Sequence, residues 1–234
     1  PVNHTPTKIA DQIIDFVTAN QGGLKEIYLS GGEPTLIKYN LKLLKQIEKR
    51  PDLNIRVNTN MQWKQENKIV QEIFKFLNVL FTCSIDGTGD KFNYIRRGAN
   101  WNRTLENIKF LQSKPNVDIR ANTVFFVLTA QQLPEIIDYF MQEIGSVDHT
   151  IDPCRMGQYH LRCRNLPTEI KSSVREDLNN TFEKYKNNLN IAGNLKNCLL
   201  ELDNEGSSAE YKEYFDNIDI IQGSNWRKLY PELT

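Results

Sequence analysis

Short apolar segments alternate with helical segments along most of the chain, and this alternation constrains the fold more than any other feature. Segments rich in β-branched and aromatic residues are the predicted strands: 25–30, 53–60, 78–86, 117–129 and 146–152. Segments with helical spacing of apolar residues precede and separate them: 7–20, 39–50, 67–77, 102–113 and 133–144. Because each connection is short, we expect parallel strands with right-handed crossovers. The pattern predicts an α/β fold, either a wound sheet or part of a (β/α) barrel.

The pattern changes after Pro153. Alternating residues predict a further strand over 158–166, and a long helix is predicted over 167–189, opened by a proline and capped by Thr168. A shorter helical pattern and a mixed tail follow. No linker rich in glycine or serine separates the two regions. We therefore predict a barrel domain over 1–153 and an extension packed on it over 154–234.

Composition narrows the class of protein. With 39% hydrophobic residues in 234, the chain has enough apolar side chains for a sizeable core. Its 29 basic and 29 acidic residues balance, which argues against nucleic acid or an anionic membrane as an obligatory partner. No apolar run approaches the roughly 18 residues of a membrane span and no signal peptide heads the chain, so we expect a cytoplasmic protein.

Small or polar residues stand where the predicted strands end, although the strand interiors are apolar. Three strands end in Ser30-Gly31-Gly32-Glu33-Pro34, Asn58-Thr59-Asn60 and Ser84-Ile85-Asp86-Gly87, and the fourth strand carries Asn122-Thr123. In parallel α/β folds, ligands bind at the carboxyl ends of the strands. These residues are therefore the candidate binding residues.

The first strand end predicts the chemistry of a ligand. Gly31 and Gly32 have no Cβ, so a ligand can approach main-chain N–H and C=O groups there. Glu33 adds an anionic acceptor suited to an ammonium group, and Pro34 fixes φ and starts the next segment. The alternative is a tight strand-to-helix turn without a ligand. The ligand expected here carries an amine and is recognised partly by the backbone.

Four segments, in this order and spacing, resemble the radical S-adenosylmethionine (SAM) superfamily, in particular its twitch-domain-containing proteins. The segments are LSGGEPTL, NTN, SIDGTGDKFNYIRRGANWNRTLENI and RANTVFFVLTAQQLPEIIDYF. The resemblance covers residues 7 to about 190, and the ending IDIIQGSNWRKLYPEL resembles the C-termini of these proteins too. It implies a partial (β/α)6 TIM-like barrel that holds a [4Fe-4S] cluster and SAM, with a twitch-like α/β appendage.

The resemblance also assigns the cofactor-binding residues. In the family, the glycine pair and glutamate of GGEP bind the methionyl amino group of SAM, and they correspond to Gly31, Gly32 and Glu33. Polar residues at later strand ends bind the SAM carboxylate and ribose. The matching positions are Thr59, Ser84, Asp86 and Asn122. The resemblance implies that Arg96 in YIRRG pairs with the SAM carboxylate in a bidentate manner.

The cluster motif of the family is missing. Its three thiolates come from a CxxxCxxC loop upstream of GGEP, and the 234 residues contain no such motif. Cys83 is expected to be a small buried hydrophobic residue, and Cys154 and Cys163 are too few and too far apart for an auxiliary cluster. Either the sequence lacks the first strand and cluster loop of a longer enzyme, which the first residue Pro1 favours, or it is a degenerate barrel.

The resemblance implies an enzyme that cleaves SAM reductively to a 5′-deoxyadenosyl radical, which abstracts hydrogen from a substrate. The substrate is unspecified, a peptide or a sugar-like metabolite, and the electron donor is a protein such as flavodoxin or ferredoxin. One alternative is a non-catalytic barrel that retains an amine or nucleoside pocket. Another is an ordinary barrel enzyme with Glu33 and Asp86 as acid and base.

Histidine and aromatic residues add weaker predictions. His4, His149 and His160 have no metal-binding spacing. His149 and Asp152 fall on the last predicted barrel strand, near its expected mouth, and are candidates to face a substrate. Trp63, Tyr94 and Trp101 are expected to be packing residues.

Overall fold

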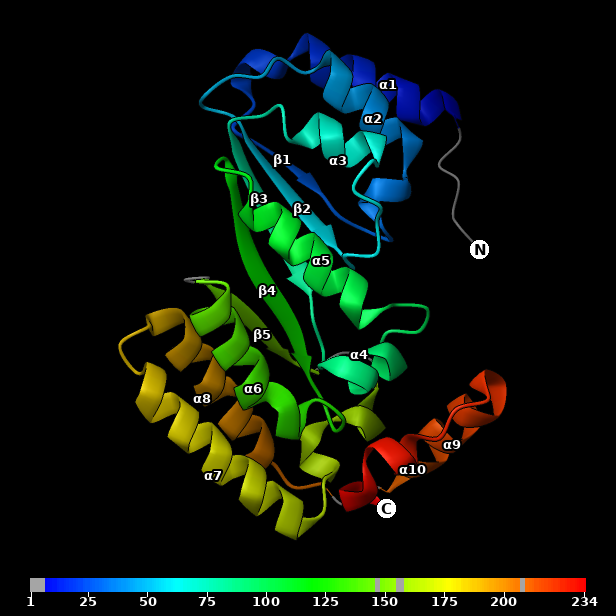
Figure 1. Cartoon of the computed structure of the whole chain (residues 1–234), viewed down its shortest axis with the longest axis vertical. Helices are drawn as coiled ribbons and strands as arrows, with labels where there is room; N and C mark the ends of the chain where they lie inside the picture. The colour runs from blue at the N-terminus through cyan, green and yellow to red at the C-terminus, as the bar shows by residue number, and fades with distance from the viewer. Residues whose placement is uncertain (1–6, 146–147, 155–157, 207–208) are drawn as a thin grey trace. The chain divides into compact units, whose positions relative to one another are not determined.

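The computed structural model describes residues 7–145, 148–154, 158–206 and 209–234. The strands are β1 Glu26–Leu29, β2 Asn54–Thr59, β3 Asn78–Ser84, β4 Val117–Phe125 and β5 His149–Pro153. The helices are α1 Thr7–Ala19, α2 Lys38–Gln46, α3 Lys68–Ile73, α4 Gly89–Ile95, α5 Trp101–Gln112, α6 Leu133–Asp138, α7 Thr168–Tyr185, α8 Leu189–Asp203, α9 Glu210–Gln222 and α10 Trp226–Leu229 (Figure 1). Short 3-10 turns and one π-helical turn, Tyr139–Glu143, complete the described structure.

The strands form one sheet in the order β1-β2-β3-β4-β5. β1 pairs with β2, β2 with β3 and β4 with β5, and each of these pairs is parallel. A helix follows each of the first four strands in the chain, as the crossover connections between parallel strands require. The predicted α/β fold with a parallel sheet is confirmed.

The chain divides into two compact units. The first comprises Pro1–Cys83 with Arg103–Ile119, and the second comprises Ser84–Asn102 with Arg120–Thr234. Each unit has a core of its own and is described by itself below. The predicted division into domains at Pro153 stays a prediction.

The first unit has an aromatic and aliphatic core, to which α2, α3 and α5 contribute buried residues. Ile55 and Val57 of β2 are fully buried, as the alternating side chains of a half-covered strand should be. Trp63 packs against Phe81 and Phe110 with ring centroids 6.2 and 6.3 Å apart. The prediction that Trp63 is a packing residue is confirmed.

The second unit is built around β5 and the helices that follow it. α7 and α8 run side by side (Figure 1) and bury Val174, Leu178 and Leu195. Trp226 of α10 is fully buried and lies against Phe215 of α9, with ring centroids 5.8 Å apart. In this unit Tyr94 is buried too, as predicted.

The strand predicted over 158–166 is wrong. Residues Tyr159–Leu161 and Cys163–Asn165 are 3-10 turns, whose amide N–H groups bond locally, from Leu161 to Gln158 O and from Leu166 to Cys163 O, each at about 3 Å. Leu161 and Cys163 are nevertheless buried, so the alternation in the sequence reflects burial. In the described residues after Pro153 the structure has helices and turns and no strand.

Two further differences concern helices. Thr168 is the first residue of α7, and Pro167 precedes it without any side-chain cap, so the predicted Thr168 cap is wrong. α4 was not predicted, because the glycines at 87 and 89 resemble turn residues.

Candidate functional site

The turn after β1 exposes its main chain. Gly31 and Gly32 have φ angles of +83° and +54°, a left-handed conformation that side-chain-bearing residues rarely adopt. Apart from each glycine and its two chain neighbours, no atom of the described residues lies within 4 Å of the position that a Cβ would occupy at either glycine. The glycines are therefore required by the backbone conformation, and the space beside them is open to a ligand. That a ligand approaches the main chain here stays a prediction.

Glu33 follows the glycines and accepts hydrogen bonds from three residues. Its Oε1 accepts from the Thr35 hydroxyl at 2.7 Å and the Thr35 amide at 3.2 Å, which caps the turn Pro34–Leu36. The Thr59 hydroxyl lies 3.0 and 3.1 Å from the two carboxylate oxygens. The Asn60 amide donates to Oε2 at 2.8 Å. The carboxylate therefore joins the end of β1 to the end of β2.

The residues around this carboxylate are themselves fixed. Asn40 Nδ2 donates to Pro34 O, and Asn67 Nδ2 donates to Thr35 O, each at 2.9 Å. Thr35 and Thr59 are each only 2% exposed. The sequence analysis did not predict that Thr35 and the Asn60 amide contact Glu33, although Thr35 is the threonine of the GGEPT segment. Its contact with Glu33 follows from the turn geometry.

Asp86 and Arg96 form an ion pair in the second unit. Arg96 Nη2 lies 2.6 Å from Asp86 Oδ2, and Asp86 Oδ1 accepts from the Val124 amide at 2.8 Å. Burial raises the pKa of Asp86, while Arg96 opposes that rise. The Arg96 Nε is buried and finds no hydrogen-bond partner in the described part of the chain. A guanidinium with an unused buried donor fits an anionic ligand group such as a carboxylate.

The other two predicted residues, Ser84 and Asn122, also belong to the second unit, but only Ser84 lies at a strand end. Ser84 is the last residue of β3. Asn122 lies in β4, and its main-chain oxygen accepts from the Ile85 amide at 2.9 Å. Gly31, Gly32, Glu33 and Thr59 belong to the first unit, whereas Ser84, Asp86, Arg96 and Asn122 belong to the second. Each set is therefore assessed from its own contacts.

His149 does not face a substrate, contrary to the prediction. Its side chain is fully buried in β5, and its Nε2 lies 2.8 Å from Thr123 Oγ1. Because that hydroxyl donates to Ile85 O at 2.5 Å, His149 Nε2 carries the proton and donates to Thr123. Burial lowers the pKa of His149 to about 3. Asp152 is exposed on the same strand, so the two do not form a pair.

The cysteines do not fit an iron–sulfur cluster. All four lie in the described residues, and Cys83, Cys163 and Cys198 are fully buried. Burial raises the pKa of Cys83 and of Cys163, which disfavours the thiolate that iron requires. Within the ranges that the structure describes, no three His, Cys, Asp or Glu side chains are placed to hold a metal ion. The prediction that Cys83 is a buried hydrophobic residue is confirmed.

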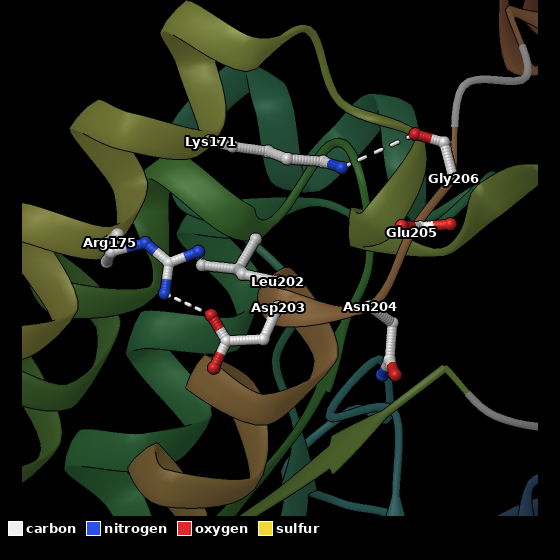
Figure 2. A pocket seen from close by; sticks show the side chains of 7 residues that line it. All are labelled: Lys171, Arg175, Leu202, Asp203, Asn204, Glu205 and Gly206. Carbon is white, nitrogen blue, oxygen red and sulfur yellow. Dashed lines mark hydrogen bonds and ion pairs between the residues drawn. The ribbon is translucent and has the colours of Figure 1, made fainter.

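A hollow of about 460 Å³ in the second unit is a separate feature. It is lined by Lys171, Arg175, Leu202, Asp203, Asn204, Glu205 and Gly206 (Figure 2). Arg175 pairs with Asp203 across it, and Lys171 Nζ lies 3.4 Å from Gly206 O. Its charges therefore compensate one another, and it contains none of the predicted binding residues.

Solved structures resemble this chain over most of its length. Streptococcus suis SuiB bound to precursor peptide SuiA is 17% identical to this chain with a TM-score of 0.56, and the match covers 76% of this chain and 40% of SuiB. SuiB bound to S-adenosylmethionine is 17% identical with a TM-score of 0.55, and the match covers 76% of this chain and 41% of SuiB. AnSMEcpe with bound AdoMet and Cp18Cys peptide is 16% identical with a TM-score of 0.53, and the match covers 80% of this chain and 54% of AnSMEcpe. At these identities the likeness shows the fold, and the chain spans about half or less of each relative.

In the described residues, no helix is both long enough and apolar enough to cross a membrane.

Family membership rests on the sequence. No curated protein matches the chain. The family model of the radical SAM superfamily matches residues 1–140, which is more than half of the chain. The chain therefore belongs to the radical SAM superfamily.

Proposed function

We propose that this chain supplies the SAM-binding part of a radical SAM enzyme. The observation that carries the proposal is the turn Gly31–Glu33, where open main chain lies directly beside an anionic carboxylate. An ammonium group has three donors, so main-chain carbonyls together with one carboxylate oxygen form a suitable acceptor set. The methionyl amino group of SAM is the amine that family membership favours here.

The two oxygens of Glu33 are not equally used. Oε1 is contacted by the Thr35 amide, the Thr35 hydroxyl and the Thr59 hydroxyl. Oε2 is contacted by the Thr59 hydroxyl and the Asn60 amide. Oε2, which has fewer donors, is the oxygen proposed to accept from the amine.

The predicted residues of the second unit are proposed as SAM-binding residues from their own contacts. The unused Arg96 Nε is the donor proposed for the SAM carboxylate, while Asp86 holds the other side of the guanidinium. Ser84 and Asn122 stay proposed contacts to SAM that rest on the resemblance alone.

The radical chemistry needs a group that this chain does not hold. When bound, a [4Fe-4S] cluster would supply the electron that cleaves SAM to a 5′-deoxyadenosyl radical. We propose that its thiolates come from outside these 234 residues, since the four cysteines lack the required spacing and three of them are buried. Without that segment, the chain on its own would be inactive.

A peptide substrate is the proposal that the relatives support. SuiB and AnSMEcpe are both described with bound peptides. An electron donor such as flavodoxin or ferredoxin, a cytoplasmic location and a twitch-like role for residues 154–234 are proposed from the resemblance alone.

A non-catalytic SAM-binding module is the second candidate, and the buried cysteines favour it. The test is anaerobic reconstitution, with iron and sulfide, of the longest protein that the gene encodes, followed by an assay for 5′-deoxyadenosine from SAM. The enzyme proposal expects 5′-deoxyadenosine in the presence of a reductant. A reconstituted protein that binds SAM and releases none would instead support the binding module.

A further inference from the structure

We propose that Thr35 and Thr59 are positioning residues for Glu33, and that Thr59 acts on a bound amine through Glu33 without touching it. The predicted effect on amine binding rests on the proposed function, whereas the positioning of Glu33 rests only on contacts within the first unit. It changes the role of Thr59, which the resemblance places among the direct ligands of SAM.

The hydroxyl of Thr59 is already fully used. Its oxygen lies 3.0 and 3.1 Å from the two oxygens of Glu33, so its single proton is donated to that carboxylate. Its oxygen accepts from the Met61 amide at 3.1 Å. With its proton committed and its side chain 2% exposed, Thr59 has no donor left for a ligand.

Strain in the next turn supports a positioning role. Met61 has a φ of +61°, which a residue with a long side chain rarely adopts. The turn is held by Asn107, whose Nδ2 donates to Met61 O at 2.9 Å, and by the Met61 amide on Thr59. Such strain persists only where the surroundings fix it, and here the strained residue directly follows Asn60, whose amide donates to Glu33.

Thr35 fixes the carboxylate from the other side. Its amide and hydroxyl both donate to Oε1, so rotation of the carboxylate would break two bonds. Thr35 and Thr59 together supply three of the four donor groups that contact the carboxylate in the described residues, and the Asn60 amide supplies the fourth. The arrangement selects one orientation of the acceptor before any ligand arrives, which lowers the entropy cost of binding.

The test is a double-mutant cycle on the affinity of this chain for SAM, measured by calorimetry. Thr59→Val keeps the shape and removes the hydroxyl, and it should raise Kd about fivefold, as loss of one hydrogen bond implies. In a Glu33→Ala background, Thr59→Val should have no further effect. Thr59→Ser keeps the hydroxyl and should bind SAM with the wild-type affinity. Thr82→Val is the matched control, because the buried Thr82 hydroxyl has no partner in the described residues.

Two results would overturn the inference. One is an equal effect of Thr59→Val with and without Glu33, which would make Thr59 a direct ligand. The other is found without ligand, by hydrogen exchange at the Asn60 amide. Glu33→Ala and Thr59→Val should both speed exchange there, whereas Thr82→Val should not, and unchanged exchange would remove the network. If SAM fails to bind while the exchange result holds, the proposed function fails and the positioning of Glu33 stands.

Discussion

Single residues around Glu33 show how a binding carboxylate is prepared. Without its donors, the side chain would rotate freely and lose entropy on meeting a ligand. Thr35, Thr59 and Asn60 fix it before binding. Glu33 therefore has two connected functions, because it caps a turn and presents one acceptor site.

His149 gives a prediction on pH. Its folded-state pKa, about 3, lies below the ordinary value of 6.5, so the unfolded chain takes up a proton that the folded chain does not. Its contribution to stability is fully present above about pH 6.5 and is lost as the pH falls toward 3. The expected slope is roughly 1.4 kcal/mol per pH unit in that window.

Urea unfolding at several pH values, with wild type and His149→Gln compared, isolates this contribution from the carboxylates. Gln keeps an amide donor for Thr123 and does not titrate. The variant should lose part of the acid-dependent slope between about pH 6 and 4. Identical slopes would contradict a buried neutral His149.

The residue-level predictions succeeded where a local reason was enough. Gly31 and Gly32 have the positive φ expected of glycines in this turn, and Cys83 is buried because it lies in an apolar strand. The contact between Thr59 and Glu33 joins residues 26 apart in sequence. A short-range sequence pattern cannot predict a contact between residues so far apart. For the same reason the sequence did not predict that His149 is buried.

Helices and strands follow the apolar pattern, and their exceptions have physical causes. The predicted strand 117–129 ends at Phe125, where the Thr129 hydroxyl bonds back to Val124 O at 2.7 Å and closes a turn. The alternation over 158–166 produces alternating burial in 3-10 turns. A strand needs a partner as well as a pattern, and the sequence does not reveal that partner.

Two glycines near the ends of α8 give an element-scale prediction. A Cβ on Gly206, just after α8, would lie 2.6 Å from Arg164 Cγ and 2.8 Å from Arg164 O. Gly206→Ala should therefore destabilise the chain by about 1–3 kcal/mol, since the backbone oxygen cannot yield easily. Gly193 lies within α8, and a Cβ added there would meet no described atom within 4 Å other than its chain neighbours and the backbone of its own helix. Gly193→Ala should therefore stabilise the chain by about 0.5–1 kcal/mol.

Urea midpoints of the two alanine variants measure this difference directly. Equal midpoints would mean that the loop after α8 shifts without cost. The comparison is matched, because both changes add one methyl group to the same unit.

At the scale of the whole molecule, cysteine placement predicts poor cluster assembly. Reconstitution of this chain alone with iron and sulfide should give far less than one [4Fe-4S] cluster per chain, because Cys83, Cys163 and Cys198 are fully buried. Iron and acid-labile sulfide per chain, measured after removal of unbound metal, test this. A full cluster per folded chain would show that these cysteines rearrange to hold one.

The most direct test of the central claim compares two ligands on the wild-type chain and on Glu33→Ala. SAM carries the amino group, whereas 5′-methylthioadenosine shares its adenosine and lacks the amino acid. Glu33→Ala should raise the Kd for SAM by about tenfold, as loss of a charge-assisted hydrogen bond implies, and leave that for 5′-methylthioadenosine unchanged. Unchanged SAM affinity, or equal loss for both ligands, would contradict an amine site at Gly31–Glu33.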